Sequence, residues 1–259
     1  MTTPPAAPPA GKPRKPRYPA TVKAVSPLTP RMIRVTFSSP ELAEFGWNGP
    51  AAHIKLIFGP VSSDPDAPRP TMRTYTPRRF DRATRELDVD FVLHGEGPAS
   101  SWAAQAAAGQ SLTISGPGRF YTVDPAATSF VLAGDDTAIP AISTILEQLP
   151  PSVRATVFLE VVDAAEEHEV YGGANATITW LHRGEDPKKA GSLLEGALRD
   201  FQFPADGCRV YVACEAGAMR RIRKHLLTER GMQRDHIVSR GYWKLGATDH
   251  PDGDYGQDV

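Results

Sequence analysis

The first half of the chain alternates between apolar and polar side chains, which is the pattern of β-strands with one buried face. The alternation is strict over residues 87–94, where every second side chain is apolar. Further strand patterns lie at residues 31–37, 53–58 and 71–80. Proline and glycine punctuate the spaces between them. Several short strands with such breaks predict a small antiparallel β-barrel over residues 18–126, interrupted by one helix from about residue 98 to 108.

The pattern changes near residue 128, where continuous apolar runs replace the alternation. Such runs are typical of parallel strands that are buried on both faces. They lie at residues 129–133, 154–162, 176–181 and 208–214. Segments with helical periodicity lie between and after them, at about residues 139–149, 191–200 and 216–230. Strands that alternate with helices predict an α/β domain with a mainly parallel sheet over residues 127–246.

Charge, hydropathy and cysteine spacing restrict the class of protein. The chain of 259 residues has a formal net charge of -1, so nothing in its charge indicates a nucleic-acid partner. It has no run of about 18 apolar residues, so no membrane span is predicted. Cys208 and Cys214 lie on one predicted strand, too far apart for a disulfide. Reduced thiols favour a cytoplasmic protein.

Both ends of the chain are expected to lie outside the two domains. Residues 1–17 are rich in proline and alanine, carry several cations and lack the apolar segment of a secretory signal. They predict a disordered leader. Residues 247–259 are polar and acidic, and they predict a flexible tail.

The segment from Phe91 to Trp102 joins a predicted strand to a predicted helix through a glycine-containing turn. Pro98 stands at the first helical position, where proline is favoured. The unpaired N–H groups of the first helical turn, with the hydroxyl of Ser100, suit a pyrophosphate. The strand alternation places on one face Asp90, Val92 and His94. His94 can therefore point at the same site, although a plain strand-turn-helix with a solvent-facing histidine explains these residues equally well.

A second segment, Arg73-Thr74-Tyr75-Thr76, places a guanidinium, an aromatic ring and a hydroxyl on one predicted strand. Tyr75 can pack on a planar ring, and Thr76 can hydrogen-bond a ring nitrogen. Arg73 can pair with a phosphate or stabilise a reduced, anionic cofactor. Taken alone, the segment fits an ordinary edge strand better.

Together with later segments, these motifs resemble the siderophore-interacting proteins. This family comprises flavin-dependent ferric-siderophore reductases related to the ferredoxin–NADP reductase superfamily. The matching segments are Arg73-x-Tyr75-Thr76-x-Arg78, His94-Gly95-x-Gly97-Pro98-Ala99-Ser100-x-Trp102-Ala103, Gly134 to Ile142, Glu215-Ala216-x-Ala218-Met219-Arg220 and Gly241-Tyr242-Trp243-Lys244-x-Gly246. They occur in the family's order. The first is shared by the whole superfamily, whereas the second and the last are much more specific.

The resemblance implies FAD bound between the barrel and a nicotinamide-binding α/β domain. NADH or NADPH would supply electrons for iron acquisition, and ferredoxin is an alternative donor. The cofactor-binding residues that the resemblance implies are Arg73, Tyr75, Thr76, Asp90, Val92, His94, Ala99, Ser100, Trp102 and Thr137. Two positions depart from the family pattern. Asp136 replaces the usual Glu, and Cys214 replaces a Gly near the expected nicotinamide path.

The substrate implied by the resemblance is a ferric siderophore, which is often anionic. Its pocket should therefore contain cations, and the candidates are Lys55, Arg119 and Lys244. Each of them also fits an ordinary surface cation. Electron transfer needs orientation and charge rather than proton transfer, so no catalytic acid or base is assigned. The histidine and cysteine spacing shows no metal-binding motif.

The function expected from these residues is a cytoplasmic, monomeric FAD-dependent ferric-siderophore reductase. One alternative is a flavoreductase with another acceptor, such as free flavin, a quinone or a partner protein. Another is a non-enzymatic protein that binds a ferric siderophore and hands it on.

Overall fold

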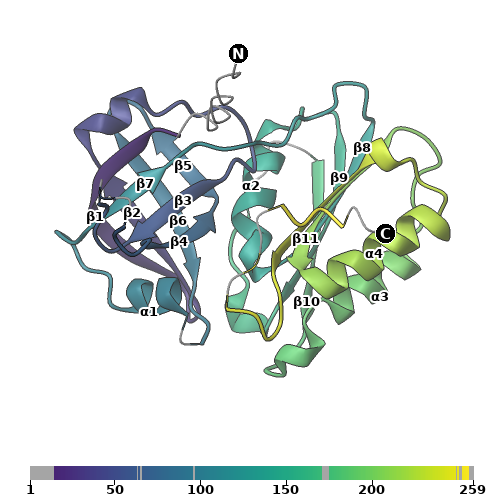
Figure 1. The fold of residues 1–259 in the computed structure, drawn as a ribbon. Helices are drawn as coiled ribbons and strands as arrows, with labels where there is room; N and C mark the ends of the chain where they lie inside the picture. Colours follow the sequence, from purple (N-terminus) through teal and green to yellow (C-terminus); the bar gives the residue numbers. More distant parts are fainter. Residues whose placement is uncertain are drawn as a thin grey trace, which may run out of the picture.

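The computed structural model describes residues 15–62, 64, 66–95, 97–170, 175–248, 250 and 253–256. In these residues two β-sheets form the two halves of the molecule, and α2 (Ile139–Gln148) lies between them (Figure 1). The N-terminal sheet is antiparallel and curled, and the C-terminal sheet is parallel. This architecture confirms the predicted fold class. Most of the predicted leader, residues 1–14, lies outside the described residues.

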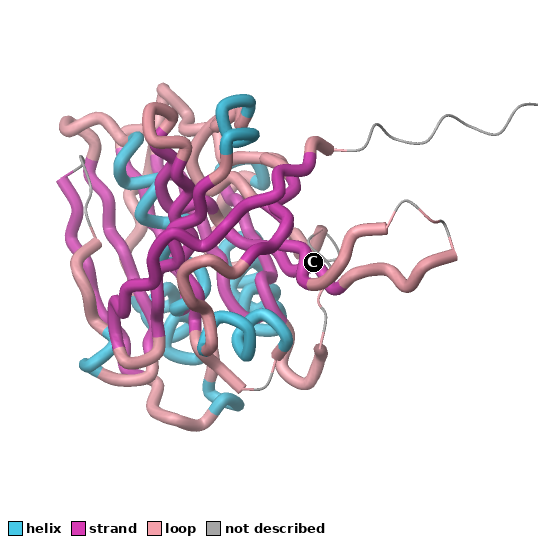
Figure 2. The backbone as a smooth tube through the Cα atoms, turned by 90° about the vertical axis from the view of Figure 1, so that its left-hand side faces the viewer, coloured by secondary structure: helices cyan, strands magenta, loops and turns pink. Residues whose placement is uncertain are grey.

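The N-terminal sheet has seven strands in the order β4-β3-β7-β1-β2-β6-β5. In chain order they are β1 (Arg17–Thr29), β2 (Met32–Ser38), β3 (Ile54–Phe58), β4 (Thr71–Tyr75), β5 (Pro77–Asp81), β6 (Glu86–Val92) and β7 (Ser111–Ser115). The helices among them are η1 (Pro40–Glu44) and α1 (Pro98–Ala104). Figure 2, viewed from the barrel side, shows these strands crossing at the front of the molecule. Thr76 alone separates the edge strands β4 and β5, so the two edges of the sheet meet there.

The side chains of β6 point alternately to the two faces of the sheet, which are different environments. Leu87, Val89 and Phe91 are fully buried in the barrel core, as the pattern predicts. Asp88 and Asp90 lie on the opposite face and are also buried, because arginines of β2 and β5 pair with them. Buried carboxylates are stable only when they are paired in this way.

The C-terminal sheet has five strands in the order β10-β9-β8-β11-β12. They are β8 (Ser129–Asp135), β9 (Arg154–Val161), β10 (Asn175–His182), β11 (Cys208–Glu215) and β12 (Ile237–Trp243). The remaining helices are η2 (Asp136–Ala138), η3 (Ala164–Glu166), η4 (Pro187–Lys189), α3 (Ser192–Asp200), α4 (Ala216–Thr228) and η5 (Arg234–His236).

Helices cover both faces of this sheet, which is why its central strands are apolar runs rather than alternating ones. Leu132 packs with α2 on one face, and its neighbour Val131 packs with α3 and α4 on the other (Figure 1). Because the strands are parallel, their carboxyl ends meet at one edge. Asp135, Glu215 and Trp243 end three of them there. This is the edge at which open α/β sheets bind ligands.

Candidate functional site

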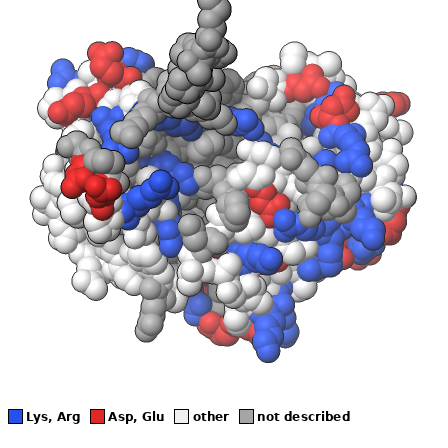
Figure 3. Space-filling model, viewed as in Figure 1, with Lys and Arg blue, Asp and Glu red and all other residues white. Residues whose placement is uncertain are grey.

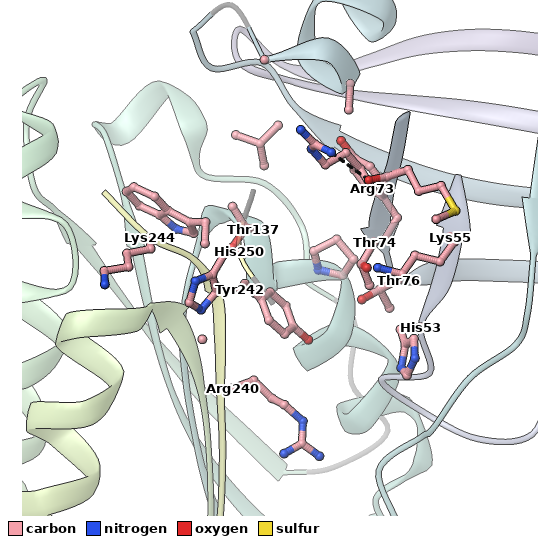
Figure 4. A pocket seen from close by; sticks show the side chains of 18 of the residues that line it. His53, Lys55, Arg73, Thr74, Thr76, Thr137, Arg240, Tyr242, Lys244 and His250 are labelled. Atoms are coloured by element: carbon pink, nitrogen blue, oxygen red, sulfur yellow. Dashed lines mark hydrogen bonds between the residues drawn. The ribbon is translucent and has the colours of Figure 1, made fainter. Parts of the chain in front are cut away.

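A cavity of about 640 Å³ lies between the two halves. Volumes of about 300–1,000 Å³ are typical of small-molecule and cofactor sites. One wall comes from β3, β4, β6 and the start of α1. The other comes from η2, β12 and the described C-terminal residues. Figure 4 shows Lys55 and Lys244 on opposite sides of the cavity, with Tyr242 between them.

The cavity gathers most of the predicted site residues from both sheets. Of the ten predicted cofactor residues, nine line it: Arg73, Tyr75, Thr76, Asp90, Val92, His94, Ala99, Ser100 and Thr137. The predicted substrate-binding cations also line it: Lys55, Arg119 and Lys244. The structure does not bring Trp102 to this lining. Its ring packs in the barrel, against the rings of Phe37, Phe58 and Phe91.

The start of α1 faces the cavity. Gly97 is the N-cap residue, and it offers no side-chain hydrogen bond to the first turn. Ser100 Oγ accepts a hydrogen bond from His94 N at 2.9 Å, which fixes the turn before the helix. The Ser100 hydroxyl keeps its own proton for a ligand. Uncapped N–H groups beside a hydroxyl donor suit an anionic group.

Tyr75 and Thr76 form the neighbouring part of the wall. The Tyr75 ring lies 4.5 Å from the Phe91 ring, and burial raises the pKa of the Tyr75 hydroxyl. The Tyr242 hydroxyl hydrogen-bonds to the Tyr211 hydroxyl at 2.9 Å and to the side chain of Thr76. Figure 4 shows Tyr242 pointing from β12 towards Thr76. A chain of hydroxyls thus joins the parallel sheet to the point where the barrel edges meet.

Asp135 holds Thr137 on the opposite wall. Asp135 Oδ1 accepts hydrogen bonds from Thr137 N and Oγ1, at 3.1 and 2.5 Å. Its Oδ2 accepts from Glu215 N at 3.0 Å and from Trp243 Nε1 at 2.8 Å. Burial, followed by the charge of Asp136, raises the pKa of Asp135 to about 7. The hydrogen bonds from Thr137 and Trp243 oppose that rise.

The cavity wall is basic, although the whole chain has a net charge of -1. The lysines and arginines that line it are Lys55, Arg73, Arg119, Arg240 and Lys244. Among the lining residues that the structure describes, Asp90 supplies the one carboxylate, and Arg34 binds both of its oxygens at 2.7 and 2.9 Å. Figure 3 shows Lys and Arg side chains around the hollow between the two halves. Such a wall attracts an anionic ligand.

The structure adds lining residues that the sequence reasoning missed: His53, Phe120, Arg240 and Tyr255. Tyr255 belongs to the predicted tail, and the described part of that segment packs against β12. Gly241 N donates to Asp254 O at 2.9 Å, and Ser239 Oγ donates to Tyr255 O at 2.7 Å. No periodicity reveals such residues, because their signal lies in the partners that they meet after folding.

The two cysteines are free and buried, as their spacing on one strand predicts. Cys214 packs in the core beneath α3 and α4, with Leu194 and Met219. Burial raises the pKa of its thiol, so it is a poor nucleophile. Cys214 does not line the cavity. Its departure from the family's Gly therefore leaves the cavity wall unchanged.

Within the described ranges, no helix has the length and apolar character needed to cross a membrane. The same part of the chain contains no group of three or more His, Cys, Asp or Glu residues arranged to hold a metal ion.

FAD, which the family resemblance implies, fits the donors that this cavity offers. The uncapped start of α1 suits a diphosphate, and open space surrounds Gly95 and Gly97, where an added Cβ would meet no atom within 4 Å. Tyr75 offers a ring to a flat isoalloxazine, and Thr76 offers a hydroxyl to its polar edge.

Comparison with known families agrees with this fit. The family model described as siderophore-interacting protein matches residues 127–246. The model described as siderophore-interacting FAD-binding domain matches residues 21–67 and 59–121. Between them they cover segments of both halves of the chain.

Individual relatives are similar over most of their length. The chain is 34% identical to ferric vibriobactin reductase ViuB of Vibrio cholerae over 236 residues, covering 85% of this chain and 86% of that protein. The crystal structure of a siderophore utilization protein from T. fusca has a TM-score of 0.83 and 38% identity, covering 92% of this chain and 96% of that chain. The siderophore-interacting protein SipS of Aeromonas hydrophila has a TM-score of 0.78 and 30% identity, covering 90% and 93%.

Proposed function

The chain belongs to the siderophore-interacting protein family, and on that premise we propose that it is an FAD-dependent ferric-siderophore reductase. One observation carries the proposal. The uncapped start of α1 and the wall formed by Tyr75 and Thr76 open into a single basic cavity. The first two features suit a flavin dinucleotide, and the surrounding cations suit an anionic iron chelate.

In the proposed reaction, one NADH or NADPH gives up a hydride and two ferric siderophores each take up one electron. The products are the oxidised coenzyme, two Fe(II) complexes and one proton, so electrons and charge balance. When bound, FAD supplies a ring system that takes up two electrons together and releases them singly. Reduction frees the iron, because hard oxygen ligands hold Fe(III) better than the softer Fe(II).

The proposed cofactor site uses residues of both domains, 18–126 and 127–246. The N–H groups at the start of α1, together with Ser100, hold the diphosphate. Arg73, Tyr75 and Thr76 hold the isoalloxazine and its ribityl region. Thr137 would contact the ring system from the opposite wall, where hydrogen bonds to Asp135 hold the Thr137 side chain in place.

The proposed substrate site is the cationic part of the same cavity. Lys55, Arg119 and Lys244 neutralise the negative charge of the chelate and orient it for electron transfer. Reduction of Fe(III) to Fe(II) takes up an electron and no proton, so no catalytic acid or base is assigned. The contribution of the three cations is binding and orientation, as is usual in cofactor enzymes.

We also propose that the enzyme works as a monomer in the cytoplasm, with ferredoxin as an alternative electron donor. The two buried, free cysteines fit a reducing compartment. The basic cavity wall also fits the approach of an acidic electron-transfer protein.

An anaerobic spectroscopic titration tests the proposed function. The purified protein should show a flavin absorption spectrum, which NADH, NADPH or reduced ferredoxin bleaches. Addition of a ferric siderophore should restore the spectrum and release about two Fe(II) per flavin, as measured with a ferrous-specific dye. Bleaching that ferric chelates do not reverse would point to another acceptor. A colourless protein that still binds a ferric chelate would point to a carrier.

A further inference from the structure

Phe120 is a large apolar side chain that is 42% exposed and lines the cavity. Its ring lies directly on the backbone of Gly49, where an added Cβ would come within 2.4 Å of Phe120 Cδ2. Gly49 also has a φ of 148°, which residues with a side chain rarely adopt. The glycine therefore lets the ring rest on the main chain at the cavity wall. A ring held there with much of its surface exposed is available to a ligand.

Tyr255 contributes a second ring from the C-terminal segment. The Arg240 guanidinium lies 4.3 Å from the centre of this ring, and Arg119 Nη1 donates to its hydroxyl at 3.3 Å. The segment is anchored at Tyr255 itself and at the residue before it. Ser239 Oγ donates to Tyr255 O, and the Asp254 carboxylate lies 2.8 Å from Arg220 Nη2.

The barrel side of this region adds further rings and cations. The His53 imidazole packs on Gly118, where an added Cβ would stand 2.1 Å from His53 Nε2. His53 N donates to Arg119 O at 3.3 Å, which ties the start of β3 to the loop that carries Phe120. Lys55 follows on β3 and lines the same cavity. Aromatic and cationic side chains therefore share this part of the wall.

From this juxtaposition, and resting on the proposed function, we propose that the iron chelate is an aryl one, a ferric complex of catecholate or phenolate groups. Such a complex carries rings that stack on Phe120 and Tyr255 and negative charge that pairs with Arg119, Arg240 and Lys55. The iron centre of a ferric tris-hydroxamate is electrically neutral and carries no aromatic ring, so this complex gains neither the stacking nor the charge pairing. Phe120 and Tyr255 are the residues that set this selectivity.

Equilibrium binding to the oxidised, flavin-loaded protein tests the selectivity. The probes are Fe(III) complexes of two tripodal ligands with one backbone, one bearing three catecholates and the other three hydroxamates. Binding is measured by ultrafiltration and the absorbance of the chelate. Reduction rates are not used, because the two complexes differ in reduction potential and their rates would depend on that difference as well as on binding. The tris-catecholate should bind at least tenfold more tightly.

Two substitutions locate the selectivity in the rings. F120L and Y255L should each weaken tris-catecholate binding roughly three- to tenfold, the usual worth of one aromatic pair, and leave tris-hydroxamate binding within about twofold. Y255F keeps the ring and should retain most of the affinity. L193A removes an exposed apolar side chain from α3, outside the cavity lining, and should change neither affinity.

Equal affinity for the two complexes, or equal losses for both in F120L and Y255L, overturns the aryl preference while ferric-chelate reduction stands. A protein that binds neither complex, and whose reduced flavin neither complex reoxidises, overturns the proposed function and the aryl preference together. Flavin content and unfolding midpoint, measured for each variant, separate a loss of recognition from a loss of structure.

Discussion

Asp135 ends β8 at the centre of a hydrogen-bond network that joins three strands. It is 1% exposed, and all its hydrogen-bond partners donate to it. Such a group fixes Thr137, Glu215 and Trp243 relative to one another. Its burial opposes ionisation and its donors favour it, and the net effect is a raised pKa.

The raised pKa of Asp135 predicts a pH-dependent stability. The pKa rises from an ordinary value of 3.8 to about 7, so between these values the folded protein holds a proton that the unfolded chain releases. The stability contributed by this group therefore falls as pH rises from about 4 to about 7, and then stays constant. D135N carries no titrating group and lacks this decline.

The measurement is the free energy of unfolding of wild type and D135N by urea at several pH values. Lost hydrogen bonds give the variant a constant offset. In addition to that offset, the wild type should lose stability relative to D135N as pH rises from about 4 to about 7. A difference that does not change with pH would show that the folded carboxyl titrates like a solvated one.

At the scale of elements, the start of α1 carries most of the case for a diphosphate. The helix has only seven residues, so the first-turn N–H groups, which have no partner within the helix, are a large share of all its N–H groups. Gly97 at the N-cap leaves them without a side-chain partner. Its φ of -64° and ψ of 146° are ordinary for residues with a side chain, so glycine is not required there by the backbone.

Replacing Gly97 by aspartate separates helix stability from cofactor binding. G97D gives α1 a favourable N-cap and should raise the stability of the flavin-free protein by a few tenths of a kcal/mol. The same carboxylate repels a diphosphate, so the dissociation constant for FAD should rise about tenfold or more. Fluorescence titration of the flavin-free protein with FAD measures this dissociation constant.

The matched control is G97N, which caps the helix without adding charge. Its affinity for FAD should lie within about threefold of wild type, since the cap without the charge is a small perturbation. If G97D binds FAD as tightly as G97N does, the diphosphate lies elsewhere.

At the scale of the whole molecule, the hydroxyl chain from Tyr211 through Tyr242 to Thr76 connects the two sheets. Tyr211 is buried, and within the described ranges its hydroxyl pairs with that of Tyr242. All three side chains of this hydroxyl chain line the cavity, so the contact between the domains also shapes the site.

A double-mutant cycle on the two tyrosines tests this contact. Y242F leaves the Tyr211 hydroxyl buried and unpaired, which should cost about 1–3 kcal/mol of unfolding free energy. Y211F/Y242F removes both hydroxyls and should recover the part of that loss that comes from the unpaired Tyr211 hydroxyl. The lost bond between Tyr242 and Thr76 is common to both variants, so it does not affect their difference. Urea unfolding of the flavin-free proteins gives the four values. A double variant as unstable as the sum of the single ones would mean that the hydroxyls do not interact.

The sequence by itself determined the two domain types, and most of the site residues that it predicts line the cavity. Period-two alternation in β6 and apolar runs in β8 and β9 report whether one or both faces of a strand are buried, which is a local property. The motif around Pro98 likewise depends on neighbours in the chain, so its uncapped helix start was predictable.

Only the tertiary structure decided which side chains meet. Trp102 packs inside the barrel, and Cys214 packs in the core away from the cavity. The sequence pattern allows either side chain to face the cavity or the core, and the neighbours that it meets after folding decide between the two. Trp243 reaches Asp135 across 108 residues, and Arg119 reaches Tyr255 across 136. A periodic pattern describes one helix or strand, over windows of about 11–18 residues, so it carries no information on such partners. The wall of rings and cations around Tyr255 exists only because distant segments fold onto one another.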